Sequence, residues 1–344
     1  MKQTISISTE TIIRTILIFL VLGFLFLIKN VLALFFVAII MSAAFDPFID
    51  YLQKKKFPRA LSIMGVYIIF LSLIGASFYL LAGPIVDQIK DMSRDFPQYY
   101  QKINQGLESL GRIDLNDNQT VNNGLAFITS SLSKATTGIL SFLVSLFGGI
   151  ISFFIILVIT FYLVVEEDGM KRFIRSLTPT QHQPYISQLI NKMQRKMGYW
   201  LRGQLLLSVI IFFMVFIVLS FAGVKYALIL ALTAGILEII PYLGPLISAI
   251  PAVFFAFAQS PSKALLVVVL YFIIQRVEND IIVPKVLGKS IGLNPLVVIL
   301  AILIGARVGG AIGALLAVPV TTALSVYFDD LIASKRKRET KLEA

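Results

Sequence analysis

Long apolar runs alternate along the chain with short segments that are polar and mostly basic. Within the runs the apolar positions do not alternate with period two, so they are typical of membrane-spanning helices and not of the strands of a membrane β-barrel. The runs that indicate spans are residues 15–28, 31–45, 60–83, 138–165, 203–221, 226–257, 264–283 and 296–328. This pattern predicts an all-α, polytopic membrane protein with about eight spans.

One polar insertion separates the third and fourth runs. Its apolar residues recur every three or four positions, as in an amphipathic helix, and they are Ile85, Ile89, Met92, Phe96, Tyr99, Ile103, Leu107 and Leu110. We expect Pro84 to end the third span and Pro97 to kink the amphipathic helix. Residues 112–123 are rich in Asn and Asp, which is typical of a loop, and a second amphipathic stretch begins at Leu125. A helical cap packed on the membrane bundle is favoured over a receptor module.

The predicted organisation has three parts. Residues 1–83 form an N-terminal three-helix membrane region, and residues 84–137 form the extracytoplasmic insertion. Residues 138–344 form the C-terminal transport region, which includes residues 171–202. In residues 171–202 apolar positions line one face of a helix and cations occupy the other faces, a pattern that predicts a separate helix on the inner membrane surface.

Basic residues gather beside the apolar runs and indicate the orientation of the chain. Cytoplasmic loops of membrane proteins carry an excess of Lys and Arg, and here the cations cluster in residues 54–59, 171–202 and 335–341. Both termini are therefore predicted to be cytoplasmic, with residues 85–134 outside. The net charge of +11 fits anionic lipid headgroups and gives no reason to expect nucleic acid as a partner.

Composition narrows the chemistry further. Apolar residues make up 57% of the chain and charged residues 14%, against about 25% charged residues in soluble domains. Cysteine is absent, and the single histidine, His182, lies in a polar loop between two prolines. The sequence contains no nucleotide-binding loop, nucleophile elbow or zinc-ligand motif. We therefore expect neither an enzyme nor a bound cofactor or metal.

The segment with candidate transport chemistry is residues 235–252, which read GILEIIPYLGPLISAIPA. Pro241 and Pro245 each remove a backbone donor, and Gly244 allows a turn where a larger residue would clash. Such a break survives at membrane depth only where protein or a water-filled cavity surrounds it. Together with the carboxylate of Glu238, the break indicates the solute or ion site of a transporter. A kinked structural helix, with Glu238 paired to a cation, remains the alternative.

A second candidate element follows in residues 275–284, which read QRVENDIIVP. Gln275 and Glu278 share one helical face. If this helix extends deep into the membrane, both side chains point into the bundle; otherwise they belong to a solvated helix end. We favour the inward orientation because the apolar run continues as far as Pro284.

A second interruption lies in residues 304–319, which read IGARVGGAIGALLAVP. Glycines spaced by four predict a small-residue ridge that permits close helix contact, and they are Gly305, Gly309 and Gly313. Arg307 lies on the opposite side of an ideal helix and needs an acceptor, such as Glu238, Glu278, a free carbonyl or an anionic solute. We expect the two interrupted segments to approach one another near mid-membrane. Each is either a kinked span or a re-entrant hairpin.

Several motifs along the chain resemble those of one family. They are DPFIDYL with KKKFPRALS, YWLRGQ, EIIPYLGPLISAIPA, QRVENDIIVPKVLG, LNPLVVIL and GGAIGALLAVP. In this order they resemble the autoinducer-2 exporter family, also called the PerM-like permeases, over nearly the whole chain. The resemblance implies a bacterial inner-membrane protein with about eight spans and homo-oligomeric assembly. It also implies export of the quorum-sensing signal autoinducer-2, although other members are described as sodium (lithium)/proton antiporters.

Three functions follow as hypotheses. The leading one is export of a small polar solute such as autoinducer-2, through a site that contains Glu238, Glu278 and residues around the two breaks. The second is exchange of sodium or lithium for protons, in which Glu238 or Glu278 binds ion and proton in turn. The third is a membrane scaffold that does not transport and whose outer insertion recruits partners.

Overall fold

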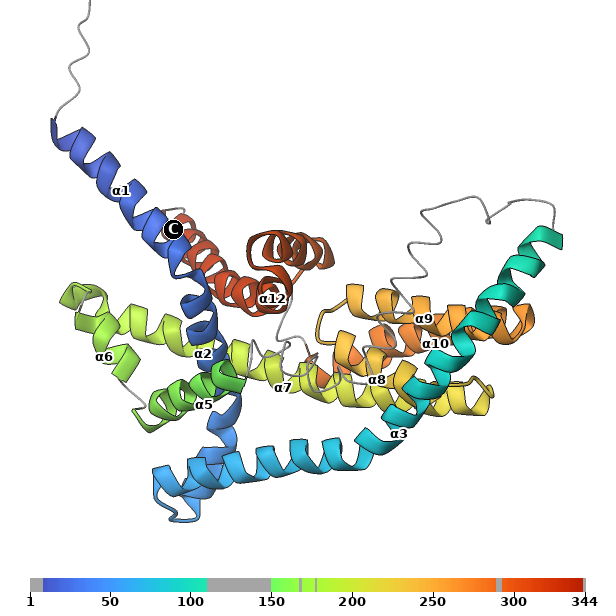
Figure 1. Cartoon of the computed structure of the whole chain (residues 1–344). Coiled ribbons are helices and arrows are strands. Elements are labelled where there is room, and N and C mark those ends of the chain that lie inside the picture. The colour runs from blue at the N-terminus through green and yellow to red at the C-terminus, as the bar shows by residue number, and fades with distance from the viewer. Residues whose placement is uncertain (1–8, 110–149, 167–168, 177, 289–292, 343–344) are drawn as a thin grey trace, which may run out of the picture.

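The computed structural model describes residues 9–109, 150–166, 169–176, 178–288 and 293–342, and the regular elements in these ranges are helical (Figure 1). The N-terminal elements are α1 (Thr9–Leu27), α2 (Lys29–Lys54) and α3 (Arg59–Ser109). The middle elements are α5 (Ile150–Val165), α6 (Gly169–Ser176), the 3₁₀-helix η1 (Thr180–His182) and α7 (Gln183–Phe221). The C-terminal elements are α8 (Ala227–Leu237), α9 (Leu243–Gln259), α10 (Pro261–Val277), the π-helix η2 (Glu278–Ile282), α11 (Val283–Val286) and α12 (Pro295–Leu342).

Five of the described helices contain segments long and apolar enough to cross a membrane. These segments are Glu10–Leu27, Lys29–Lys54, Arg59–Met92, Thr180–Phe221 and Pro295–Ile332. Shorter apolar helices cover Ile151–Val165, Ala227–Leu237 and Leu243–Gln259. Many large apolar side chains on these helices are exposed at the protein surface, as expected of residues that face lipid. The prediction of a polytopic, helical membrane protein is confirmed.

Helix α3 is longer than the sequence pattern predicts. It continues through Pro84 and Pro97, so the third span and the start of the insertion form one element. A proline inside a helix removes one hydrogen bond and bends the axis without necessarily ending the helix, and Figure 1 shows a bend within α3. The remainder of the insertion, with the loop expected at residues 112–123 and the stretch expected from Leu125, lies outside the described residues.

Helix α7 joins two elements that the sequence pattern separates. It is continuous from Gln183 to Phe221, and Gly169–Ser176 forms the separate helix α6, so the boundaries differ from those of the surface helix expected over residues 171–202. Met197 and Trp200 are buried, in an apolar cluster shared with α2 and α12. One face of this half of α7 therefore packs against the protein, whereas Lys192 and Arg195 on the same half are exposed.

Helices α2, α8, α10 and α12 pack on α7 (Figure 1). One apolar cluster joins the first half of α7 to α2 and α12. A second cluster joins the other half of α7 to α8, α9 and α10. The first part of α3 packs separately with α2 and α5. On α7 the first cluster ends at Leu201 and the second begins at Ile211, so a residue in the middle of the helix lies between the two halves of the protein.

The crossing of α2 and α7 depends on a proline. Pro47 lies inside α2 and has no N–H to bond the carbonyl of Ala43. Arg202 of α7 instead donates from Nη1 to the carbonyls of Ala43 and Ala44, at 3.0 and 3.1 Å. At Gly198 an added Cβ would overlap the same Ala43 carbonyl. The backbones of the two helices are therefore in direct contact at this crossing.

Helices α8 and α9 form a helical hairpin. The ring of Tyr226, just before α8, lies 5.4 Å from the ring of Phe255, near the end of α9. In the turn between the helices Tyr242 has a positive φ of 65°. A Cβ on Gly244 would overlap the carbonyl of Leu237, so the two helices nearly touch at the turn. The first interruption therefore reverses the direction of the chain.

Helix α12 contains a second reversal. Gly310 has φ 61° and ψ −142°, which lies outside the helical region. A Cβ on Gly305 would overlap the carbonyl of Gly313, and a Cβ on Gly313 would overlap that of Gly305. These residues would be about 12 Å apart along a straight helix, so the chain doubles back at Gly310. Both interrupted segments are thus helical hairpins and not kinked spans.

The second half of α3 packs on the first hairpin. Ile85 and Ile89 are buried in a small apolar cluster with Leu228 of α8. Farther along α3, the Tyr226 hydroxyl donates a hydrogen bond to Asp95 Oδ2 at 3.0 Å. This hydrogen bond lowers the pKa of the Asp95 carboxyl. The described part of the insertion is therefore a helix attached to the bundle.

Candidate functional site

Two acidic side chains meet in the interior of the protein. Glu238 directly follows α8 and is 2% exposed, and Glu278 is the first residue of η2 and is 5% exposed. Their carboxyl groups lie close enough to interact with each other. Ionisable groups are costly at membrane depth and mark the solute or ion pathways of transporters. The pair is therefore the first candidate for a functional site.

A local change in helix geometry positions Glu278. Helix α10 runs into the π-helix η2 and then continues as α11, and single π turns occur frequently at functional sites. The side chain of Gln275 lies beside the Glu278 carboxyl, close enough to interact with it. Arg276 is exposed instead, with its guanidinium carbon 5.3 Å from the ring centroid of Phe272. Glu278 thus points into the bundle with Gln275 beside it, whereas Arg276 points outward.

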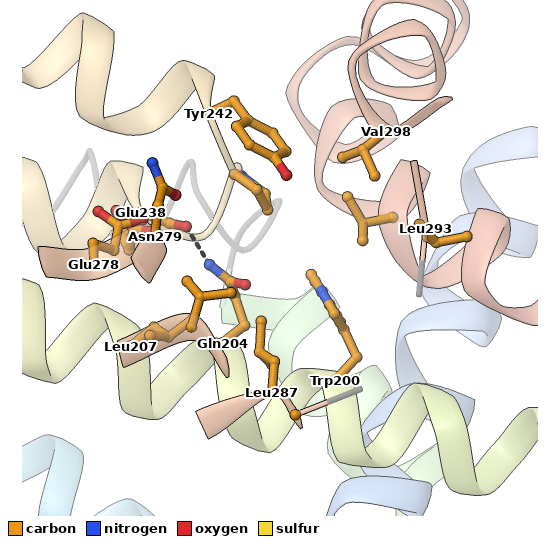
Figure 2. Close-up of a pocket in the computed structure, with 14 residues that line it drawn as sticks. Trp200, Gln204, Leu207, Glu238, Tyr242, Glu278, Asn279, Leu287, Leu293 and Val298 are labelled. Atoms are coloured by element: carbon orange, nitrogen blue, oxygen red, sulfur yellow. Dashed lines mark hydrogen bonds between the residues drawn. The ribbon is translucent and has the colours of Figure 1, made fainter. Parts of the chain in front are cut away.

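A cavity of ≈180 Å³ opens beside the acidic pair. It has room for several water molecules or for one small organic solute. Figure 2 shows the acidic side chains on one side of the cavity and Leu293 and Val298 on the opposite side. Its lining residues are Trp200, Gln204, Leu207, Glu238, Pro241, Tyr242, Glu278, Asn279, Val283, Leu287, Gly288, Leu293, Val298 and Val318.

Gln204, in the middle of α7, holds the turn that carries Glu238. It is 1% exposed, and its Nε2 donates a hydrogen bond to the main-chain carbonyl of Glu238 (Figure 2). The last carbonyls of a helix lack helical donors, so this side chain satisfies a group that the break leaves free. The sequence analysis missed Gln204. The available signal was an uncharged amide within the apolar run at residues 203–221.

Two aromatic residues at the cavity were also missed. Trp200 lies one turn before Gln204 on α7 and is 1% exposed. Tyr242 is 41% exposed, and its hydroxyl points into the cavity (Figure 2). Its positive φ is uncommon for a residue with a side chain, and such strain is frequently stored at functional sites.

The residues predicted around the first break have different positions. Pro241 lines the cavity. Gly244 and Pro245 lie in the first turn of α9 and shape the hairpin, because Gly244 allows the close approach to Leu237. They therefore act on the cavity through the turn that holds Glu238.

The second break does not reach the acidic pair. Arg307 is exposed, and the interactions of Glu238 and Glu278 with described residues include no cation. The structure therefore does not bring Arg307 to the pair. It also gives no support, within the described chain, to the alternative in which Glu238 is paired to a cation.

The glycines of the second break pack differently from the predicted ridge. Gly305 and Gly313 contact each other across the reversal, and the space beside Gly309 is open. A continuous ridge does not form because Gly310 reverses the chain between these positions.

Apolar packing nevertheless links the two breaks. Ile240 and Leu243, beside the first break, pack on a cluster that includes Ile302 and Ala314 of α12. These two α12 residues lie on either side of the reversal at Gly310. The second hairpin therefore supports the tip of the first one.

Comparison with known families decides the class of the protein. The sequence pattern of the family described as AI-2E family transporter matches residues 15–333. The chain belongs to the AI-2E family. The family resemblance that the motifs carry is thereby confirmed.

Similar AI-2E proteins are found in several bacteria. YrrI of Bacillus subtilis, named a transport protein, is 31% identical over 336 residues, which cover 92% of each chain. The AI-2 transport protein TqsA of Escherichia coli is 24% identical over 308 residues, covering 86% of this chain and 84% of TqsA. A sodium-lithium/proton antiporter of Halobacillus andaensis is 22% identical over 330 residues, covering 87% of this chain and 91% of the antiporter. The protein is thus a multi-pass bacterial membrane protein of a transporter family.

The cavity offers this AI-2E transporter hydrogen bonding and proton binding. Carboxyl, amide and phenol groups supply donors and acceptors on one side, and an apolar wall closes the other. The described residues contain no group of three or more His, Cys, Asp and Glu side chains that could hold a metal ion. The arrangement suits a small polar solute.

Proposed function

We propose that the protein exports a small polar solute such as autoinducer-2, which binds in the cavity beside Glu238 and Glu278. The position of the cavity carries this proposal, because it lies between the tip of the first hairpin, η2 and the middle of α7. Transporters commonly bind their solutes at discontinuous helices near the bilayer midplane. Autoinducer-2 is the first candidate because TqsA carries its name.

In this proposal the residues have distinct roles. Glu238 and Glu278 accept hydrogen bonds from the solute, and Gln275 orients Glu278. Pro241, Gly244 and Pro245 shape the turn that presents Glu238. Arg307 stands outside this set and acts, if it contacts the solute, elsewhere on its path.

Substitution of Glu238 tests the proposal. The full-length protein is reconstituted in liposomes, and the flux of autoinducer-2 is compared for wild type, Glu238→Gln and Glu238→Leu. Gln keeps a hydrogen-bonding group, so we expect reduced but measurable flux, whereas Leu should abolish it. Equal flux in all three proteins would contradict a role for Glu238. Wild-type liposomes no leakier than empty ones to every solute tested would favour the scaffold.

The acidic pair supports a second candidate, exchange of sodium or lithium for protons. Two buried carboxyl groups this close together favour a proton on one of them, so the pair is suited to binding and releasing protons. The antiporter of Halobacillus andaensis is a relative with that named activity. Sodium/proton exchange by wild-type liposomes that is lost completely in Glu238→Gln would favour this candidate.

We also propose an inner-membrane location with both termini in the cytoplasm, and homo-oligomeric assembly. The orientation rests on the clusters of basic residues beside the spans. Residues 10–27 of α1 are exposed, and α1 projects away from most of the protein (Figure 1). In a membrane such a helix lies against lipid or against a second copy of the chain.

A further inference from the structure

Glu238 contains a buried oxygen that lacks a donor. Among the described residues no N–H or O–H group bonds its Oε2 atom, although the side chain is 2% exposed. Buried polar atoms are nearly always hydrogen-bonded, so such an exception requires an explanation. The neighbouring carboxyl of Glu278 can act as the donor only if the pair carries a proton.

The residues that face the pair from α7 and the first hairpin do not supply a positive charge. Gln204 is neutral and already donates to the main chain of Glu238. Arg202, on the same helix, is bound to carbonyls of α2. Tyr242 is near enough to Glu278 for their charges to interact, and an ionised phenol would only add negative charge.

The described residues of the remaining elements also give the pair no cation. On η2 and α11, Asn279 is neutral, and Asp280 and Lys285 are exposed. Helix α12 contributes Val298 and Val318 to the cavity. Two buried carboxylates in contact cannot both stay ionised in such surroundings, because each charge opposes the other. Within the described chain, a proton is therefore the species that relieves this repulsion.

We propose that Glu238 and Glu278 share one proton and that the exported solute takes its place, so that one solute molecule is exchanged for one proton. This inference rests on the proposed export function. With the cavity open to the cytoplasm, the shared proton leaves to that side, and hydrogen-bond donors of the solute occupy the carboxylates. With the cavity open to the outside, the solute leaves and a proton from outside returns to the pair. One positive charge moves inward for each neutral solute that moves outward.

Accumulation of autoinducer-2 in liposomes tests the exchange. The membrane potential is clamped to zero, autoinducer-2 starts at equal concentration on both sides, and a pH gradient is imposed. Exchange for one proton moves the solute toward the acidic side, whichever way the protein is inserted. At equilibrium a gradient of about one pH unit sustains about a tenfold concentration ratio.

Two variants separate the shared proton from other effects. In Glu278→Gln an amide N–H replaces the shared proton, so solute should cross the membrane but reach equal concentrations on both sides. Asp280→Asn removes an exposed carboxylate from the same π-helix, and it should keep the wild-type accumulation. Accumulation by wild type and Asp280→Asn, but not by Glu278→Gln, supports the proposal.

Other outcomes would overturn it. Wild-type flux that ends at equal concentrations despite the pH gradient leaves the export function intact and removes proton exchange. Accumulation driven by a sodium gradient, and not by a pH gradient, assigns the site to an alkali cation. If autoinducer-2 does not cross at all, the export function fails, and infrared spectroscopy decides on the proton. A protonated-carboxyl band at neutral pH that Glu278→Gln removes supports the shared proton, and a wild-type spectrum without that band excludes it.

Discussion

At the scale of single residues, the site depends on polar groups that lie close together where helices are interrupted. The Gln204 side chain donates a hydrogen bond to the main-chain carbonyl of Glu238, and the Gln275 side chain lies beside the carboxyl of Glu278. Each acidic residue thus has a neutral amide next to it. Neither amide carries a charge, so neither removes the electrostatic reason for the acidic pair to hold a proton.

Gln204→Leu should destabilise the protein. The substitution leaves the buried carbonyl of Glu238 without its donor, and an unsatisfied buried group costs about 1–3 kcal/mol. Thermal unfolding of the purified protein in detergent measures the change. Gln259→Leu is the matched control, because the Gln259 amide bonds the carbonyl of Phe255 at a half-buried position near the end of α9. An equal loss in the two variants would contradict the special role of Gln204.

Some residues of the site could be predicted from the sequence, and others could not. Glu238 and Glu278 stood out because charges are rare in apolar runs, and the structure brings them together. Gln204 and Tyr242 did not stand out in the sequence, because single amide or phenol side chains are common in hydrophobic segments. Their importance depends on what they face across the fold, which no local pattern records.

At the scale of elements, two helical hairpins replace the interrupted spans. The prolines and glycines of the sequence predicted the positions of both breaks correctly. They are equally compatible with a kinked helix and with a reversal of the chain. The reversals depend on contacts within each hairpin, such as the approach of Gly244 to Leu237. Tertiary packing likewise explains why α3 continues through Pro84. The contacts of α3 with the bundle compensate for the helical hydrogen bond that the proline removes.

From the geometry of the second hairpin we predict opposite effects on folding for substitutions of Gly313 and Gly309. Gly313→Leu should impair folding, because any side chain there overlaps the carbonyl of Gly305. Gly309→Leu should be tolerated, because no described atom lies within 4 Å of a Cβ at that position. The yield of monodisperse protein in detergent measures both. A continuous glycine ridge would instead make Gly309→Leu damaging, and that result would contradict the reversal at Gly310.

At the scale of the whole molecule, α7 connects the α2 and α12 side of the protein to the side that contains the first hairpin. Its first half contacts α2 and α12, its second half contacts the first hairpin, and its middle lines the cavity. Movement of either half of the protein against α7 would therefore change the walls of the cavity. The sequence indicated the membrane class and the number of apolar runs, but not this arrangement, because apolar periodicity alone does not select the partners of a helix.

The orientation of the whole chain can be tested because native cysteine is absent. We expect Asn118→Cys, in the polar insertion, to react with a membrane-impermeant maleimide in intact cells. Lys55→Cys, in a basic loop, should react only after the cells are opened, since basic loops remain in the cytoplasm. The reverse labelling pattern would mean that the protein is inserted the other way round.

The wall of the cavity also contains a natural optical reporter. Trp200 is the single tryptophan of the chain, and it lines the same cavity as the acidic pair. Indole emission from the purified protein therefore originates at one known position, without any label. Wetting, drying or filling of the cavity should change the colour and intensity of that emission, so the opening of the transport path can be followed in real time with ultraviolet light.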